Sequence, residues 1–265
     1  NMTTLFSQDL MKSALTVIRD VCKVKEGERV LIVSNPQKDT APIAQSLFAA
    51  TLEIGGIPSI VFQKEKTLLD YADSVVIAAL KTEPDVFLSI SANKLGKDEE
   101  AMKNPYVAED GQKYNHIFDY LLYGAKKMRA VWTPGITSDM FCRTVCIDYK
   151  LLEDRCQNLM QILQGADYVH VTASGGTDVI VPIKGRTPFA DDGNFAKYGT
   201  GGNVPCGEVF ISPLVGGTKG RIVYDGSMSI NEGDIIIHDP IIVDVEDGYV
   251  TNISSNSGKP LSFES

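Results

Sequence analysis

The chain has 265 residues, of which 43% are hydrophobic and 22% charged, as in ordinary folded proteins. Because a single core stops growing at about 250–300 residues, we expect one large domain or two modest ones, and two is our working number. The net charge of −9 provides no cationic surface for a phosphate backbone or an anionic lipid, so nucleic acid and membrane partners are not expected. No apolar run approaches the roughly 20 residues of a membrane span, and no secretion signal is recognised, so we expect a cytoplasmic protein.

Up to residue 166, short apolar runs alternate with stretches of helical periodicity, the pattern of a parallel sheet covered by helices. Near-continuous apolar runs predict strands at Arg29–Ser34, Ser59–Gln63, Val86–Ser91 and Arg129–Thr133. Helices are expected at Leu10–Cys22, from Thr40 as N-cap to Gly55, and at Thr67–Leu80, Asn115–Ala125 and Asp148–Leu163. The sequence therefore predicts a doubly wound α/β domain over residues 1–166.

From residue 167 onward the helical periodicity disappears. Alternating segments such as 168–173 (YVHVTA) and 178–183 (DVIVPI) predict strands, and Asp225-Gly226 and Asp247-Gly248 are typical hairpin turns. We therefore expect a β-rich (α+β) domain over residues 167–265, truncated at its C-terminus.

Several catalytic motifs are incomplete. Gly199, Gly201 and Gly202 resemble the start of a phosphate-binding loop. Val204 stands where the pattern needs its last glycine, and no helix is predicted to follow. Ser174 lacks the leading glycine of a hydrolase nucleophile turn. Cys142 and Cys146 are four residues apart but have no second Cys/His pair at zinc spacing, and the five cysteines are expected to be reduced thiols.

The three histidines are explained by structural roles. His170 alternates with valines in a strand and is expected to be hydrogen-bonded there, His116 lies near a helix start, and His238 precedes Asp239-Pro240 in a predicted turn.

One segment, residues 185–213 (GRTPFADDGNFAKYGTGGNVPCGEVFISP), is too unusual to be only structural. Glu208 follows Gly207 and precedes an apolar run, so we expect its carboxylate to begin a strand and to point into the domain. A buried carboxylate must be protonated, paired with a base such as Arg186 or Arg221, or bound to a metal, and the residues leave the ion pair and the metal open.

The neighbours of Glu208 are expected to support it. Asp191 and Asp192 are expected to shape the loop or to orient ligands rather than to ligate a metal themselves. Cys206 is expected to be a small buried residue that lets Gly207 turn, in preference to a thiolate ligand.

The run Asn203–Phe210 (NVPCGEVF) follows Gly176-Thr177-Asp178 and Gly185-Arg186, and it precedes Gly220–Gly226 (GRIVYDG). In order and spacing these pieces resemble the aminopeptidase T family of metallopeptidases, the thermophilic leucyl aminopeptidases, and the likeness covers essentially the whole chain. The resemblance implies that Glu208 is a ligand of a two-metal centre containing zinc, cobalt or manganese. It also implies a peptide substrate, removal of N-terminal residues by metal-activated water, and a homodimer.

The family's other ligands are a second glutamate, a histidine and a His-x-Asp pair, which come later in the chain than the Gly-Glu-Val strand. This sequence ends at Ser265, and none of its three histidines lies at a matching position. We expect a piece of a longer enzyme, because Leu261–Ser265 stops where Ser262 would cap a new helix. A shortened relative without a complete metal centre is the alternative.

Two further functions stay open. Some relatives of this family are mononuclear iron dioxygenases that open hydroxylated pyridine rings with the downstream ligands, although the retained Glu208 favours the peptidase. A non-catalytic fragment or oligomerisation module is the third interpretation, since a lone carboxylate binds a cation poorly.

Overall fold

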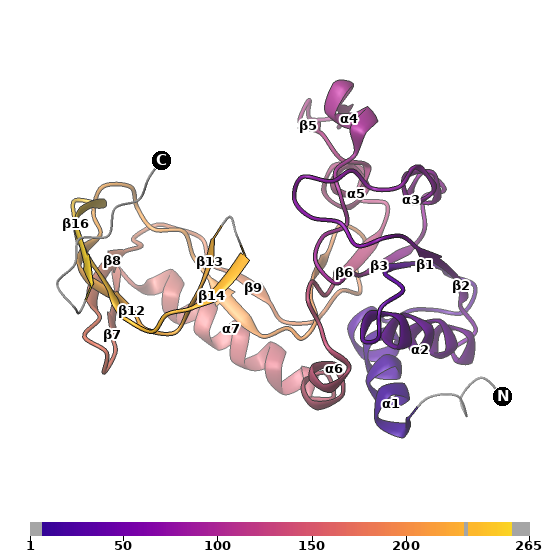
Figure 1. The fold of residues 1–265 in the computed structure, drawn as a ribbon, viewed down its shortest axis with the longest axis horizontal. Helices are drawn as coiled ribbons and strands as arrows, with labels where there is room; N and C mark the ends of the chain where they lie inside the picture. The colour runs from indigo at the N-terminus through magenta and orange to yellow at the C-terminus, as the bar shows by residue number, and fades with distance from the viewer. Residues whose placement is uncertain (1–6, 231–232, 256–265) are drawn as a thin grey trace. The chain divides into compact units, whose positions relative to one another are not determined.

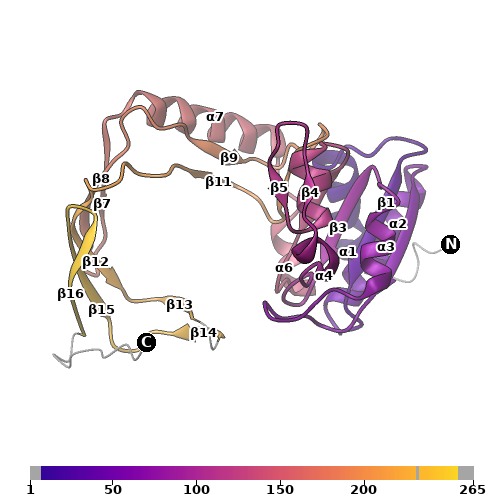
Figure 2. The ribbon, with the colours of Figure 1, turned by 90° about the horizontal axis from the view of Figure 1, so that it is seen from above.

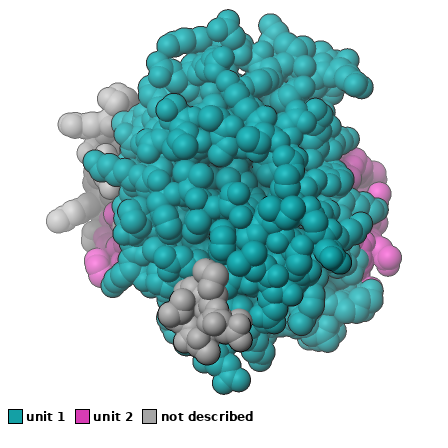
Figure 3. Space-filling view, turned by 90° about the vertical axis from the view of Figure 1, so that its right-hand side faces the viewer, with its two compact units in different colours: residues 1–156, 191–208 teal, residues 157–190, 209–265 magenta. Residues whose placement is uncertain are grey.

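The computed structural model describes residues 7–230 and 233–255. The chain divides into two compact units, residues 1–156 with 191–208 and residues 157–190 with 209–265 (Figure 3). A parallel sheet in the first unit and an antiparallel sheet in the second confirm the predicted fold class. The predicted domain boundary after residue 166 stays a prediction.

A five-stranded parallel sheet forms the centre of the first unit (Figure 1). Its strands, in spatial order, are β10 (Gly201–Asn203), β6 (Arg129–Trp132), β3 (Val86–Ile90), β1 (Arg29–Ser34) and β2 (Ile57–Phe62). All except β10 match predicted strands to within two residues.

Strand β10 was not predicted, because it contains two glycines and no apolar side chain. It pairs in parallel with β6, with Gly201 opposite Ala130. A Cβ atom on Gly201 would lie 2.5 Å from the carbonyl oxygen of Ala130, so glycine is required for this close approach.

Helices cover both faces of this sheet (Figure 1). On one face, residues of α1 (Gln8–Thr16), α2 (Thr40–Glu53) and α6 (Ser138–Thr144) share a core with Ile32 and Leu88. On the other face, α3 (Ser74–Leu80) and α5 (Ile117–Asp119) pack with Leu31 and Phe87. The remaining elements are the π-helical turns η2 (Val17–Val21) and η3 (Tyr120–Gly124), helices α4 (Glu99–Lys103) and α7 (Tyr149–Gly165), and the hairpin of β4 (Tyr106–Val107) and β5 (Lys113–Tyr114).

Two local predictions were wrong. The helix expected from Thr67 begins only at Ser74, because the Asp70 carboxylate accepts hydrogen bonds from the Thr67 amide and hydroxyl and closes a turn instead. Thr40 is the first helical residue and not the N-cap, because its hydroxyl donates to the Asn35 carbonyl and Asp39 takes the cap position. The helix expected to begin at Ser262 lies outside the described residues.

The second unit contains a five-stranded antiparallel sheet, whose strands lie side by side in Figure 2. In spatial order they are β16 (Tyr249–Ser255), β15 (Ile241–Glu246), β12 (Lys219–Tyr224), β8 (Asp178–Pro182) and β7 (Tyr168–Thr172). Asp247 and Gly248 both have positive φ, as a two-residue hairpin turn between β15 and β16 requires. Two small sheets are formed by β13 (Ser227–Ile230) with β14 (Gly233–Ile236), and by β9 (Phe189–Asp191) with β11 (Glu208–Phe210).

The segment 191–208 returns to the first unit and packs into its core. Phe195 and Val204 are buried in the same cluster as α1 and α2, and the Phe195 amide donates to the Val21 carbonyl over 3.0 Å. The segment 191–208 is therefore anchored to the first unit at Phe195 and at Val204. Within the described residues, no helix is long and apolar enough to cross a membrane.

A buried ion pair links the start of β6 to the loop before β1. The Arg129 side chain is 2% exposed and donates to both carboxylate oxygens of Glu28, over 3.0 and 2.6 Å, while its Nε donates to the Cys22 carbonyl over 3.1 Å. These bonds satisfy a charge that burial would otherwise penalise.

Candidate functional site

A pocket with a volume of about 420 Å³ lies in the first unit, beyond the end of β6. Thr133 and Pro134 follow β6 directly. On the neighbouring strand, Asn203 ends β10 and Val204–Glu208 follow it. Because both strands are parallel, their carboxyl ends open at the same edge. The other lining residues are Ile136, Met140 and Asp191.

Asp191 is held in this pocket by two backbone contacts. Its Oδ2 accepts a hydrogen bond from the Asn203 amide over 3.0 Å, and its carbonyl accepts from the Gly207 amide over 2.9 Å. Its Oδ1 is buried and has no hydrogen-bond partner among the described residues. Burial raises the pKa of Asp191 to about 6. The Asn203 amide and, more weakly, the Gly193 amide oppose this, and the charges of Glu208 and Asp192 raise it further.

Glu208 begins β11, as predicted, but its expected inward orientation is wrong. The residue is exposed, and the burial of β11 alternates between exposed and intermediate positions. A solvated carboxylate needs no neutralising base. The proposed bases are engaged elsewhere, since Arg186 donates to the Ser212 carbonyl over 2.9 Å and Arg221 pairs with Asp244 over 2.7 Å.

Cys206 and Asp192 shape the same loop. Burial raises the pKa of the Cys206 thiol to about 12, and the charge of Asp191 acts in the same direction. Without a bound metal the thiol is therefore protonated at neutral pH. Asp192 accepts a hydrogen bond from the Asn194 amide over 3.0 Å, a local contact typical of turn-forming aspartates.

The other candidate ligands make structural contacts. His170 Nε2 lies 2.7 Å from Asp178 Oδ1 on the paired strand, and His116 contacts the Gly96 carbonyl through Nε2 while its Nδ1 accepts from the Phe118 amide. His238 is exposed in a bend, and all five cysteines are free thiols. Across residues 7–230 and 233–255, no group of three or more His, Cys, Asp or Glu side chains is arranged to hold a metal ion.

Sequence reasoning missed the importance of Asp191, which we expected to shape the loop or to orient ligands rather than to ligate a metal itself. The signal available was Gly202, because a Cβ atom there would lie 2.6 Å from Asp191 Oδ1. It also missed a cavity at the carboxyl ends of β3 and β6, which Asp119 and Trp132 line. The alternation of Ser89 and Ser91 with apolar residues at the end of β3 could have indicated this cavity.

Comparison with known proteins finds one matching family model and two solved structures with a similar fold. A protein-family model described as "NicX: 2,5-dihydroxypyridine 5,6-dioxygenase" matches residues 138–259. The solved structure of 2,5-dihydroxypyridine dioxygenase from Pseudomonas putida is similar, with a TM-score of 0.65 and 14% sequence identity over 93% of this chain and 68% of that chain. AmpT, the aminopeptidase T of Thermus thermophilus, is similar with a TM-score of 0.61 and 12% identity, over 95% of this chain and 72% of that one. None of the curated proteins matches this sequence.

The chain therefore shares its fold with an aminopeptidase and with a ring-cleaving dioxygenase. At 12–14% identity the likeness is one of structure, and the link to aminopeptidase T holds at that level.

Proposed function

We propose that the protein is a metal-dependent aminopeptidase in which Glu208 is a metal ligand. The observation that carries this proposal is the buried, unpartnered Oδ1 of Asp191 in the pocket that Glu208 also lines. A buried polar atom without a hydrogen bond is unusual, and a cation would supply the missing interaction. The shared fold with AmpT supports the same assignment.

The two carboxylates fit the oxygen-donor chemistry of divalent cations but form only part of a centre. Catalytic zinc sites use three protein ligands, whereas this pocket supplies two carboxylates and a protonated thiol. The described residues thus do not make a complete site for zinc, cobalt or manganese, and we derive no catalytic step through the metal.

The pocket's own groups suit a peptide amino terminus. The exposed carboxylate of Glu208 would attract a positively charged α-ammonium group, and Ile136, Met140 and Val204 provide apolar walls beside it. We propose further that the protein acts as a homodimer, which light scattering after size-exclusion chromatography would test.

A ring-cleaving dioxygenase is the second candidate. It is favoured by the family match over residues 138–259, a range that includes Asp191 and Glu208. A non-catalytic module is the third candidate, and the incomplete ligand set among the described residues favours it.

One experiment separates the three candidates. The purified protein is supplied in turn with Zn²⁺, Co²⁺, Mn²⁺ and Fe²⁺, and hydrolysis of leucyl-p-nitroanilide is measured beside oxygen uptake with 2,5-dihydroxypyridine. In the full-length protein we expect hydrolysis that is lost in Glu208→Gln and retained in Glu53→Gln, an exposed acid on α2. Oxygen uptake without hydrolysis would establish the dioxygenase instead, and neither activity would support the non-catalytic module.

A further inference from the structure

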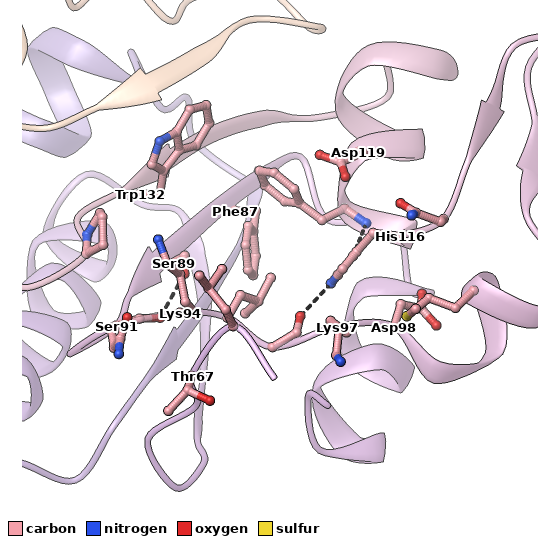
Figure 4. A pocket seen from close by; sticks show the side chains of 18 residues that line it. Thr67, Phe87, Ser89, Ser91, Lys94, Lys97, Asp98, His116, Asp119 and Trp132 are labelled. Carbon is pink, nitrogen blue, oxygen red and sulfur yellow. Dashed lines mark hydrogen bonds between the residues drawn. The ribbon is translucent and has the colours of Figure 1, made fainter. Parts of the chain in front are cut away.

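A second cavity of about 420 Å³ lies in the first unit, outside the carboxyl ends of β3 and β6 (Figure 4). Neither Asp191 nor Glu208 lines it. In open parallel sheets, ligands bind at this edge, where the loops after the strands form a crevice. The cavity therefore occupies a position at which this class of fold binds small molecules.

Three aromatic rings form one wall of the cavity. The ring centroids of Phe87 and Phe118 lie 5.5 Å apart, and those of Phe118 and Trp132 lie 5.8 Å apart at an interplanar angle of 87°. Phe87 is fully buried, so the wall is fixed by the core of the unit. Such a surface suits an aromatic or other apolar ligand body.

Asp119 is the charged group of this wall. It is the last residue of α5, it is half-buried, and its carboxylate forms no hydrogen bond or ion pair with another described residue. Burial raises its pKa, and His116 opposes this only in part. In Figure 4, Asp119 and Trp132 lie above Phe87, whereas Lys94 and Lys97 lie below it.

Several other polar groups that line the cavity are already engaged. Both carboxylate oxygens of Asp98 accept backbone hydrogen bonds, from Ala101 and Ile117, each over 3.0 Å. Both ring nitrogens of His116 are hydrogen-bonded, and the Lys97 ammonium lies 4.8 Å from the centre of the Tyr71 ring. Lys94 is exposed, so water and salt screen its charge.

We propose that this cavity binds a small aromatic cation, with its ammonium group paired to Asp119 and its ring against Phe118 and Trp132. A carboxylate that is partly removed from water and has no partner of its own is stabilised by pairing with a cation. The aromatic faces add cation–π attraction to the same charge. This proposal goes beyond the proposed peptidase function and does not depend on it.

The test uses the fact that Trp132 is the single tryptophan of the chain, so intrinsic fluorescence reports on this cavity. Benzylammonium, benzyl alcohol and benzoate have the same ring and differ in charge, and each is titrated into the protein. We expect a saturable fluorescence change with benzylammonium and an affinity about tenfold tighter than that for benzyl alcohol. Benzoate is expected to bind more weakly than the alcohol.

Two variants locate the effect. Asp119→Asn is expected to lower the affinity for benzylammonium about tenfold and to leave the affinity for benzyl alcohol unchanged. Glu109→Gln removes an exposed acid that does not line the cavity, and it should change neither value.

The proposal is overturned if benzylammonium gives no saturable change at millimolar concentration, if benzoate binds as tightly, or if Asp119→Asn binds benzylammonium like the wild type. If Asp119→Asn does not fold, the ratio of cation to alcohol affinity in the wild-type protein decides alone, and a ratio near one rejects the proposal.

Discussion

The backbone amide of Asn203 donates a hydrogen bond over 3.0 Å to Oδ2 of Asp191, which fixes a carboxylate whose other oxygen is buried without a partner among the described residues. Asn203 is the last residue of β10, the short strand that joins the parallel sheet beside β6. The glycine-rich stretch thus positions an acid at the carboxyl edge of the sheet.

The raised pKa of Asp191 predicts a pH-dependent stability. A carboxyl whose pKa is about 6 in the folded state and 3.8 in the unfolded state binds a proton more tightly when folded. Its contribution to stability is therefore full below about pH 3.8 and is lost as the pH rises through 6. We expect the free energy of unfolding of the wild type, relative to Asp191→Asn, to fall by about 1 kcal/mol between pH 4 and pH 7, after allowance for solvent screening.

Urea denaturation in chelator-treated buffer measures this difference. Asp110→Asn, on an exposed turn, is the matched control. A wild-type stability that rises relative to Asp191→Asn over this pH range would contradict the assignment.

The close approach at Gly202 predicts a steric effect. A Cβ atom there would lie 2.6 Å from both Asp191 Oδ1 and the Phe195 ring, so Gly202→Ala must displace the carboxylate or the buried ring. We expect a loss of about 1–3 kcal/mol of unfolding free energy by urea denaturation. Gly226→Ala, where an added Cβ meets nothing within 4 Å, should change stability by less than about 0.5 kcal/mol. Equal effects of the two substitutions would refute the packing argument.

The buried pair of Glu28 and Arg129 predicts a large effect from a single change. Glu28→Gln would leave the buried guanidinium without its counter-charge, at an expected loss of about 3–4 kcal/mol. Asp139→Asn breaks the exposed pair with Arg143 and should remove less than about 1 kcal/mol. Thermal and urea unfolding would measure both, and a Glu28→Gln loss as small as the control's would show that the pair contributes little.

The sequence predicts those parts of the fold that are held by continuous apolar runs. Strands β1, β3 and β6 are buried on both faces, and their residues are visible as such in the sequence. Strand β10 is not visible, because its glycines are needed for close approach to Ala130 and leave no apolar pattern. The start of α3 was misplaced because the local hydrogen bonds of Asp70 compete with the helix.

The candidate sites also depend on tertiary packing that the sequence pattern does not reveal. A Gly-Glu pair before an apolar run indicates the start of a strand, and Glu208 does begin β11, but the exposure of a short strand depends on tertiary packing. The surroundings of the Asp191 carboxylate are set by strand β10, which comes later in the chain. Gly202 approaches Oδ1 closely, and the Asn203 amide donates to Oδ2. Phe87 and Trp132 line one cavity because β3 and β6 are neighbours in the sheet, an order that the sequence does not state.

The central claim is that Glu208 and Asp191 bind a divalent cation, and calorimetric titration of Zn²⁺ or Mn²⁺ into the metal-free protein tests it most directly. We predict that Glu208→Gln and Asp191→Asn each weaken binding at least about tenfold, while Glu53→Gln does not. Binding that is unchanged in both site variants would contradict the claim.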